Sequence, residues 1–102
     1  MLIFNTTYQI SPGYFEEWVK WIKTEHIPFM LQSGKFTTPQ LVKVMLHDET
    51  EGSSYSLQFK IKNMEELLYW QNEHGQAFES NCREKFGTEV LFFSTVLEVV
   101  DL

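Results

Sequence analysis

Cysteine, positive charge and long apolar runs are scarce in this sequence, and each shortage excludes a class of protein. The single cysteine, Cys82, rules out an intrachain disulfide, and no base is placed to activate it as a catalytic thiol. Eight Lys and Arg against 14 Asp and Glu give a net charge of -6, which argues against nucleic acid or anionic membrane as a partner. No apolar run approaches the roughly 20 residues of a membrane-spanning helix. The first ten residues lack a signal-peptide pattern, so we expect a cytoplasmic protein.

Several catalytic and metal-binding motifs are also missing. Neither G-x-G-x-x-G nor a P-loop occurs, and there is no G-x-S-x-G elbow, C-x-x-C pair or H-E-x-x-H motif. The three histidines, His26, His47 and His74, fall on separate expected elements without metal-ligand spacing. His47 stands beside Asp48 at an expected turn and is interpreted as a solvated loop residue. We therefore expect no metal and no cofactor.

The 102 residues fit one domain, residues 1–102, and 16% of them are aromatic. Residues 2–10 are rich in β-branched and aromatic side chains, which indicates a strand. Ser11 is a candidate helix N-cap with Pro12 at the first helical position, and an apolar stripe then continues to about Gln32. Pro28 should kink or interrupt this helix, and Gly34 should end it.

The remaining elements follow from turns and periodicity. Residues 35–39 read as a short connection, and residues 40–48 and 55–62 as strands that pair in an antiparallel hairpin. Asn63 should cap a second helix that ends at Phe86-Gly87, and residues 89–100 should form the last strand. The order β-α-β-β-α-β predicts an α+β, ferredoxin-like fold with a four-stranded antiparallel sheet and two helices on one face.

The other face of this sheet should remain open. Tyr55, Leu57, Phe59 and Ile61 are the apolar set that should meet the helices, which leaves Ser56, Gln58 and Lys60 facing away, together with Ile3, Asn5 and Thr7. On the last strand either alternate set could join the open face: Phe92, Ser94, Val96 and Glu98, or Leu91, Phe93, Thr95, Leu97 and Val99. Such a mixed face is too apolar for solvent and too polar for a dry core, so we expect two copies to pack face to face.

The order of elements, the stretches "EHIPFMLQSGKF" and "SYSLQFKI" and the closing "FFSTVLEVV" resemble the dimeric α/β-barrel superfamily. Within it, the chain is most similar to a family of short bacterial proteins of unassigned function, common in Bacteroidetes. The resemblance implies a homodimer whose two sheets form a barrel. It implies no reaction, because the superfamily includes oxygenases, isomerases, peroxidases and apparent non-enzymes.

Three residues are candidates for catalysis: His26, Asn5 and His74. His26 lies on the apolar stripe of the first helix, where a core histidine with a satisfied hydrogen bond competes with a ligand-facing acid or base. Asn5, Trp70 and His74 are similar to the residues of dimeric-barrel enzymes that oxidise aromatic substrates or degrade haem. Trp70 and His74 are only one turn apart here, closer than in those enzymes. The candidate ligand-binding residues are Asn5, Gln58, Trp70 and Ser94.

These observations leave three functions open. The first is a homodimeric α/β-barrel protein of uncharacterised function that binds a small ligand, or none, in the barrel. The second is a cofactor-independent monooxygenase or isomerase, similar to antibiotic-biosynthesis monooxygenases or haem-degrading enzymes, acting on an aromatic substrate. The third is a structural or interaction module only.

Overall fold

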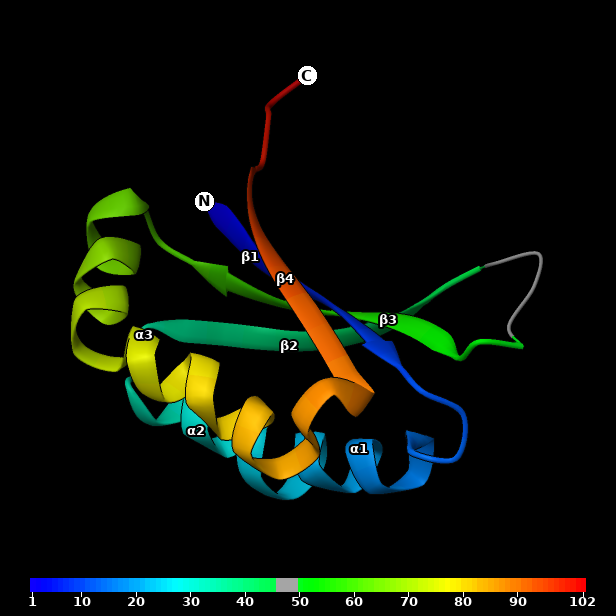
Figure 1. Ribbon diagram of the computed structural model, residues 1–102. Coiled ribbons are helices and arrows are strands. Elements are labelled where there is room, and N and C mark those ends of the chain that lie inside the picture. The colour runs from blue at the N-terminus through cyan, green and yellow to red at the C-terminus, as the bar shows by residue number, and fades with distance from the viewer. Residues whose placement is uncertain (46–49) are drawn as a thin grey trace.

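The computed structural model describes residues 1–45 and 50–102, which form one four-stranded sheet with helices on a single face (Figure 1). The strands are β1 (Leu2–Ile10), β2 (Phe36–Val44), β3 (Ser53–Ile61) and β4 (Val90–Glu98), in the spatial order β2-β3-β1-β4. All three strand pairings are antiparallel. The predicted ferredoxin-like α+β fold is confirmed.

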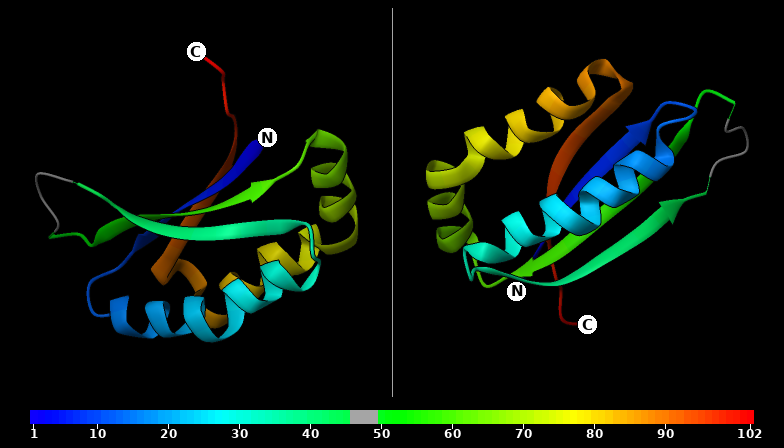
Figure 2. Two further views of the ribbon diagram at one scale, coloured as in Figure 1. Left: turned by 180° about the vertical axis from the view of Figure 1, so that it is seen from behind. Right: turned by 90° about the horizontal axis from the view of Figure 1, so that it is seen from below.

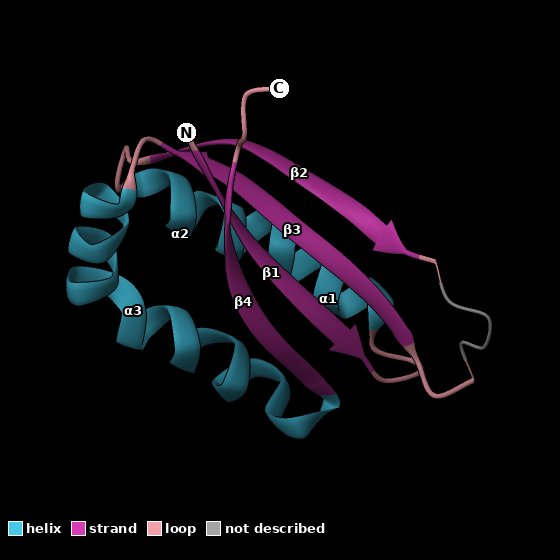
Figure 3. Cartoon of the chain, turned by 90° about the horizontal axis from the view of Figure 1, so that it is seen from above, coloured by secondary structure: helices cyan, strands magenta, loops and turns pink. Residues whose placement is uncertain are grey.

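The helices pack on one side of this sheet only. The first helical region comprises α1 (Phe15–Trp21), a π-helical turn η1 (Ile22–His26) and α2 (Ile27–Gln32). The second is α3 (Met64–Phe86), followed by the short 3₁₀ helix η2 (Gly87–Glu89). Figure 2 shows both regions on the same side of the sheet, and Figure 3 shows the opposite face with no helix over it.

The core lies between this helical layer and the sheet. Alternation along the strands places one set of side chains under the helices, as predicted for Leu57, Phe59 and Ile61, all of which are buried. The helices supply large side chains in return, among them Trp18, Trp21, Trp70 and Phe78. Phe4 contacts Trp70 and Phe78 edge-on, with ring centroids 5.7 Å apart in both pairs.

The first helix starts later than the sequence indicates. Ser11 is not its N-cap, because the Ser11 N–H donates to Glu89 O and so stays in the extended chain. A turn follows, in which the Tyr14 N–H donates to Ser11 O and Gly13 adopts a φ of 90°. The helix then begins at Phe15 with Tyr14 as an N-cap that makes no side-chain hydrogen bond.

Pro28 interrupts the helix by widening it. The Ile27 N–H donates to Ile22 O, five residues back, so the segment before the proline is a π turn. Pro28 has no N–H, and its ring collides with the preceding carbonyls of a regular α-helix. The wide turn accommodates the ring, and α2 continues to Gln32. Gly34, with a φ of 75°, ends the helix as predicted.

Strand β2 begins earlier than the sequence indicates. Residues 36–39 belong to the strand and not to a connection, although a register shift separates Thr37 from Gln40 in its pairing with β3. Thr38 adopts a φ of 56° at this irregularity. The expected strand end at residue 48 and the loop position of His47 lie outside the described residues.

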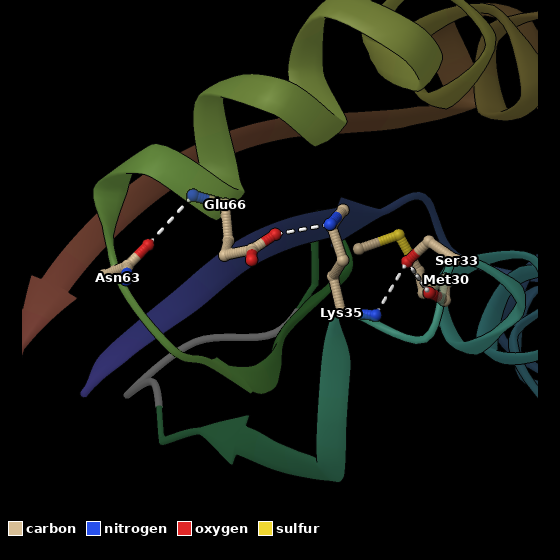
Figure 4. Close-up of polar contacts among 5 residues, drawn as sticks. All are labelled: Met30, Ser33, Lys35, Asn63 and Glu66. Carbon is tan, nitrogen blue, oxygen red and sulfur yellow. Dashed lines mark hydrogen bonds and ion pairs between the residues drawn. The ribbon is translucent and has the colours of Figure 1, made fainter.

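The start of α3 is fixed by two side-chain contacts (Figure 4). Asn63 Oδ1 accepts a hydrogen bond from the Glu66 N–H at 2.9 Å, as expected of an N-cap. The Glu66 carboxylate pairs with the Lys35 ammonium, and this contact lowers the pKa of Glu66. Lys35 follows the α2 C-terminus, where its N–H donates to Ser33 Oγ. These contacts join the end of α2 to the start of α3.

We expect Asn63→Ala to lower the free energy of unfolding by about 1 kcal/mol, because it leaves the Glu66 N–H without its cap. Urea unfolding followed by circular dichroism measures the change. Asn63→Asp is the matched control and should retain most of the stability, since a carboxylate also caps. Equal midpoints for Asn63→Ala and the unmodified chain would contradict the role of this cap.

Candidate functional site

The four candidate ligand-binding residues fall on opposite sides of the sheet. Asn5 and Gln58 face the open side, where Gln58 Nε2 donates to Asn5 Oδ1 at 3.2 Å. Ser94 instead faces the helices, because it pairs with the buried Thr6 and its hydroxyl lies 2.9 Å from Thr6 Oγ1. Trp70 is buried under the same helix-side face. Ser94 therefore does not join Asn5 and Gln58, and the open-face set of β4 is the one that contains Thr95.

The centre of the open face carries a connected network of uncharged polar groups. Asn5 Nδ2 donates to Thr95 Oγ1 at 3.1 Å and to Thr7 Oγ1 at 3.3 Å. Thr7 Oγ1 in turn lies 3.0 Å from Ser56 Oγ. The network thus links β4, β1 and β3 through hydroxyl and amide groups. It can both donate and accept hydrogen bonds, which suits it to orient a small polar molecule.

The same face is almost free of charge. Cross-strand register places on it the residues Ile3, Asn5, Thr7, Gln9, Thr37, Gln40, Val42, Val44, Ser54, Ser56, Gln58, Lys60, Leu91, Phe93, Thr95 and Leu97. Although the chain has 14 acidic residues, none belongs to this set, and Lys60 is its one charged member. Glu98, the one acidic residue within the described strands, pairs with Leu2 and lies on the helix side.

Trp70 and Ser94 border a cleft between α3 and β4. It has a volume of about 360 Å³, and its wall includes Phe4, Trp70, Gln71, Gly75, Gln76, Phe78, Glu79 and Ser94. Gly75 lies in the helix interior, where an added Cβ would meet only Gln71 Cβ, at 3.9 Å. Nothing in the packing requires a glycine there, and its missing side chain keeps the cleft wide.

The trio Asn5, Trp70 and His74 is not brought together. Trp70 and His74 are neighbours on α3, with ring centroids 6.4 Å apart, but Asn5 lies on the open face across the sheet from them. The His74 ring contacts Phe29 edge-on at 6.3 Å and does not line the α3–β4 cleft. The resemblance to haem-degrading enzymes therefore does not extend to this set of side chains.

His26 is a buried aromatic group of the core, only 2% exposed. Its Nε2 lies 3.2 Å from the Tyr8 hydroxyl, and its ring stacks on Trp21 with centroids 4.7 Å apart. Burial lowers the pKa of His26 to about 4, so the imidazole is neutral at physiological pH. Its Nδ1 is buried and has no hydrogen-bond partner among the described residues.

Cys82 is also buried, and burial raises the pKa of its thiol to about 11. The thiol is therefore protonated at physiological pH, which agrees with its interpretation as inert. Within residues 1–45 and 50–102, no group of three or more His, Cys, Asp or Glu side chains is arranged to hold a metal ion. None of the helices in these ranges is both long and apolar enough to cross a membrane.

Sequence reasoning does not identify several polar partners. Thr95 belongs to one of the two alternate sets of β4, and only the register with β1 makes it the partner of Asn5. The hydroxyls of Thr7 and Ser56 follow from alternation once Asn5 is assigned to the open face. No sequence signal marks Asn81 and Glu84, which line a cavity beside His26.

A four-stranded antiparallel sheet in the order β2-β3-β1-β4, with both helical regions on one face, is the ferredoxin-like fold. Residues 1–100 match the family model of a domain of unknown function, DUF4286, so the chain belongs to this family. No curated protein matches the sequence.

Solved structures share the fold at low sequence identity. A dimeric ferredoxin-like protein from an uncultured marine organism has a TM-score of 0.68 at 16% identity, covering 100% of this chain and 97% of the other. An EthD-family protein from Bacillus halodurans has a TM-score of 0.71 at 12% identity, covering 98% and 100%. A candidate antibiotic biosynthesis monooxygenase from Deinococcus radiodurans has a TM-score of 0.67 at 12% identity, covering 100% and 95%. These similarities establish the fold alone.

We expect the protein to lose stability on mild acidification because of His26. The imidazole has a pKa of about 4 when folded but about 6.5 when unfolded, so the unfolded chain binds more protons between these values. The free energy of unfolding should therefore fall by about 2 kcal/mol between about pH 7 and pH 5 through this group. Urea titrations at both pH values measure the fall.

The control for this pH effect is His26→Phe, which keeps an aromatic ring but cannot titrate. The other titratable groups, including the neighbouring Glu25, Lys85 and Tyr8, are present in both proteins. Their contributions to the pH dependence of the free energy of unfolding therefore cancel in the comparison. Between about pH 7 and pH 5, the free energy of unfolding of the variant should fall by about 2 kcal/mol less than that of the unmodified chain. An identical pH dependence in the two proteins would contradict a neutral, buried His26.

We expect Gly75→Ala to raise the free energy of unfolding by about 0.5–1 kcal/mol, because alanine favours the helix and the added Cβ meets open space. Thermal and urea unfolding measure the gain. Asn72→Ala, an exposed position of the same helix outside the cleft, is the matched control for helix propensity. Destabilisation by Gly75→Ala would mean that close packing requires the glycine.

Proposed function

We propose that the protein is a homodimer that binds a small, uncharged polar molecule between its two facing sheets. The observation that carries this proposal is the open face itself, with an uncharged hydrogen-bonded network at its centre and apolar side chains around it. Exposed Phe93 and Leu97 on β4 and Val42 on β2 supply apolar surface toward the two edges. Two such faces in contact would bury this surface and enclose the network.

The distribution of charge favours a second copy of the chain as the partner. Each chain has a net charge of -6, so most surfaces of two copies repel one another. The open face carries no acidic side chain, and its contact would bring no carboxylates together. The marine ferredoxin-like protein of the same fold is described as dimeric. We also propose that the protein is bacterial and cytoplasmic.

The ligand would lie against the network around Asn5 and Gln58. Amide and hydroxyl groups of both copies would offer donors and acceptors without fixed charge, which suits a neutral polar molecule. No carboxylate or histidine belongs to this face among the described strand residues, and its one charged side chain, Lys60, lines a small cavity with Gln58. Binding is therefore the activity that the open face supports best.

We expect Leu97→Glu to convert the dimer into a monomer, because it would place a carboxylate from each copy in the apolar interface. Sedimentation velocity at micromolar concentration measures the change. Leu68→Glu is the matched control, since Leu68 is similarly exposed (54%, against 43% for Leu97) but lies on α3. A monomeric unmodified chain, or a dimer in both variants, would contradict the interface.

Native mass spectrometry of gently purified protein tests the ligand. We expect a dimer with retained additional mass, and loss of that mass in Asn5→Ala without loss of the dimer. Gln9→Ala, on the same strand and face but outside the network, should retain the mass. A bare dimer in the unmodified protein would favour an interaction module without a ligand.

The α3–β4 cleft supports a second candidate function, cofactor-independent oxygenation of an aromatic substrate. Its wall contains the aromatic rings of Phe4, Trp70 and Phe78, and its volume of about 360 Å³ suits a molecule of one or two rings. The Deinococcus radiodurans protein of the same fold is described as a candidate monooxygenase.

An oxygen electrode tests this second function with 1,4-dihydroxynaphthalene, an electron-rich aromatic diol. Enzymatic uptake should exceed the autoxidation rate of the diol and should disappear in Gly75→Leu, whose side chain fills the cleft. Gly75→Ala, with a much smaller side chain, should retain most of the uptake. Uptake at the autoxidation rate with unmodified protein would exclude oxygenation of this substrate class.

A further inference from the structure

A small cavity lies on the open face at the irregularity in the pairing of β2 with β3. Thr37 pairs with Lys60 and Gln40 with Gln58, so two residues of β2 stand opposite Phe59 alone. This extra residue makes a β-bulge, a feature that re-aims side chains and is common beside active sites. The cavity has a volume of about 110 Å³, and its wall consists of Ile3, Thr38, Gln40, Gln58, Phe59 and Lys60.

Thr38, at the bulge, adopts a backbone conformation that is unfavourable for threonine. Its φ of 56° lies in the left-handed region, where a β-branched residue is an outlier. Glycine or asparagine would adopt this φ at a lower cost in free energy. Residues held in such conformations concentrate at active sites and ligand-binding sites. The strained residue belongs to the cavity wall, which indicates that the cavity has a binding role.

Lys60 gives the cavity a positive charge that no carboxylate balances. No ion pair joins Lys60 to an acidic residue within the described part of the chain. Its cross-strand neighbours, Ile3 and Thr37, are uncharged. A second copy packed against this face would bring no carboxylate from its own open face either. The counter-charge must then come from elsewhere, because an ammonium that is removed from water without one is costly.

The other polar side chains of the wall can also donate hydrogen bonds. Thr38 has a hydroxyl, and Gln40 and Gln58 have amide groups with two N–H donors each. Gln58 Nε2 donates to Asn5 Oδ1, and the same nitrogen has a second N–H. Thr38, Gln40 and Lys60 are exposed, so a molecule that enters from solvent can reach them. One positive charge among neutral donors favours an anionic ligand.

Charge and size together favour a short carboxylate over other anions. One ammonium balances one negative charge, and a chain with a net charge of -6 repels a dianion such as phosphate more strongly. The described wall contains neither an arginine nor a helix N-terminus, which are common phosphate-binding groups. A volume of about 110 Å³ holds a carboxylate with only a few carbon atoms, and Ile3 offers them an aliphatic surface.

We propose that the cavity at the β2 bulge binds a short aliphatic carboxylate, whose oxygens accept hydrogen bonds from the Lys60 ammonium and from Thr38 and Gln40. The hydrocarbon end of this ligand lies against Ile3. Each chain contains a complete cavity. The site therefore goes beyond the proposed function, and it depends neither on the dimer nor on a neutral ligand at the network around Asn5.

The test titrates three probes into ¹⁵N-labelled full-length protein: acetate, its neutral isostere acetamide, and inorganic phosphate. Each is added up to about 50 mM at constant ionic strength, because a ligand with so few atoms binds weakly. We expect saturable chemical-shift changes with acetate at the backbone amides of Thr38, Gln40 and Lys60 and at the side-chain amide of Gln58. Acetamide should cause no saturable change there, and phosphate should bind more weakly than acetate.

Substitutions of Lys60 test the charge. Lys60→Gln removes the charge but keeps a hydrogen-bond donor, and should weaken acetate binding by at least about tenfold. Lys60→Arg keeps the charge and should bind acetate within about threefold of the unmodified chain. Lys62→Gln is the matched control, because Lys62 is also exposed but lies outside the cavity. Its acetate affinity should stay within about twofold of the unmodified chain, since salt screens more distant charges.

Thr38→Gly separates binding from folding. Glycine adopts a φ of 56° without strain, so the urea midpoint of this variant should be no lower than that of the unmodified chain. Loss of the hydroxyl should weaken acetate binding by about threefold or more. If Thr38 served folding alone, acetate binding would stay unchanged.

Saturable acetate binding that depends on Lys60 and Thr38 supports the proposal. It is overturned by equal binding of acetamide, by tighter binding of phosphate, by the absence of a saturable change with acetate, or by unchanged acetate affinity in Lys60→Gln or Thr38→Gly. A monomeric chain in sedimentation, or a bare dimer in mass spectrometry, would contradict the proposed function but not this site, because the cavity lies within one chain.

Discussion

The structure depends on the burial of one face of the sheet and not the other. Both helical regions cross on the same side, so the aromatic side chains of the strands and helices gather in a single layer around Phe4, Tyr8 and Trp70. That layer supplies most of the apolar burial available to a chain of this size. The opposite face receives no helix, and its chemistry is free to serve contact and recognition.

The link between Tyr8 and His26 connects the sheet to the helical layer. Tyr8 is a central strand residue of the core, and its hydroxyl reaches a histidine held on the π turn that precedes Pro28. The proline excludes a regular helix at this point, and the wide turn in turn carries His26 into the core. One backbone irregularity thereby produces both a buried neutral imidazole and the cavity beside it.

Charged side chains, like the buried apolar ones, are distributed unequally between the two faces of the sheet. The described acidic residues lie on helices, loops, the chain end and the helix-side end of β4, whereas the open face presents amides, hydroxyls and aliphatic groups. An acidic protein stays dispersed through repulsion between its other surfaces, and the open face is where repulsion between two copies is weakest. The same segregation leaves the polar network around Asn5 without a carboxylate on its face, where Lys60 is the one charged residue of the described strands.

The sequence by itself determined the order of elements and most of their bounds, because alternation of period two, helical periodicity and the cap at Asn63 are local signals. It also indicated an open face with Asn5 and Gln58 on it. It misplaced the starts of the first helix and of β2, since the Ser11 pairing with Glu89 and the irregularity at Thr38 are set by neighbouring strands. Only the tertiary structure decided that Ser94 and Thr95 point to opposite faces, that Asn5 and Trp70 lie on opposite sides of the sheet, and that His26 meets Tyr8. These relations depend on cross-strand register and on packing between residues far apart in the chain, which no local pattern of side chains specifies.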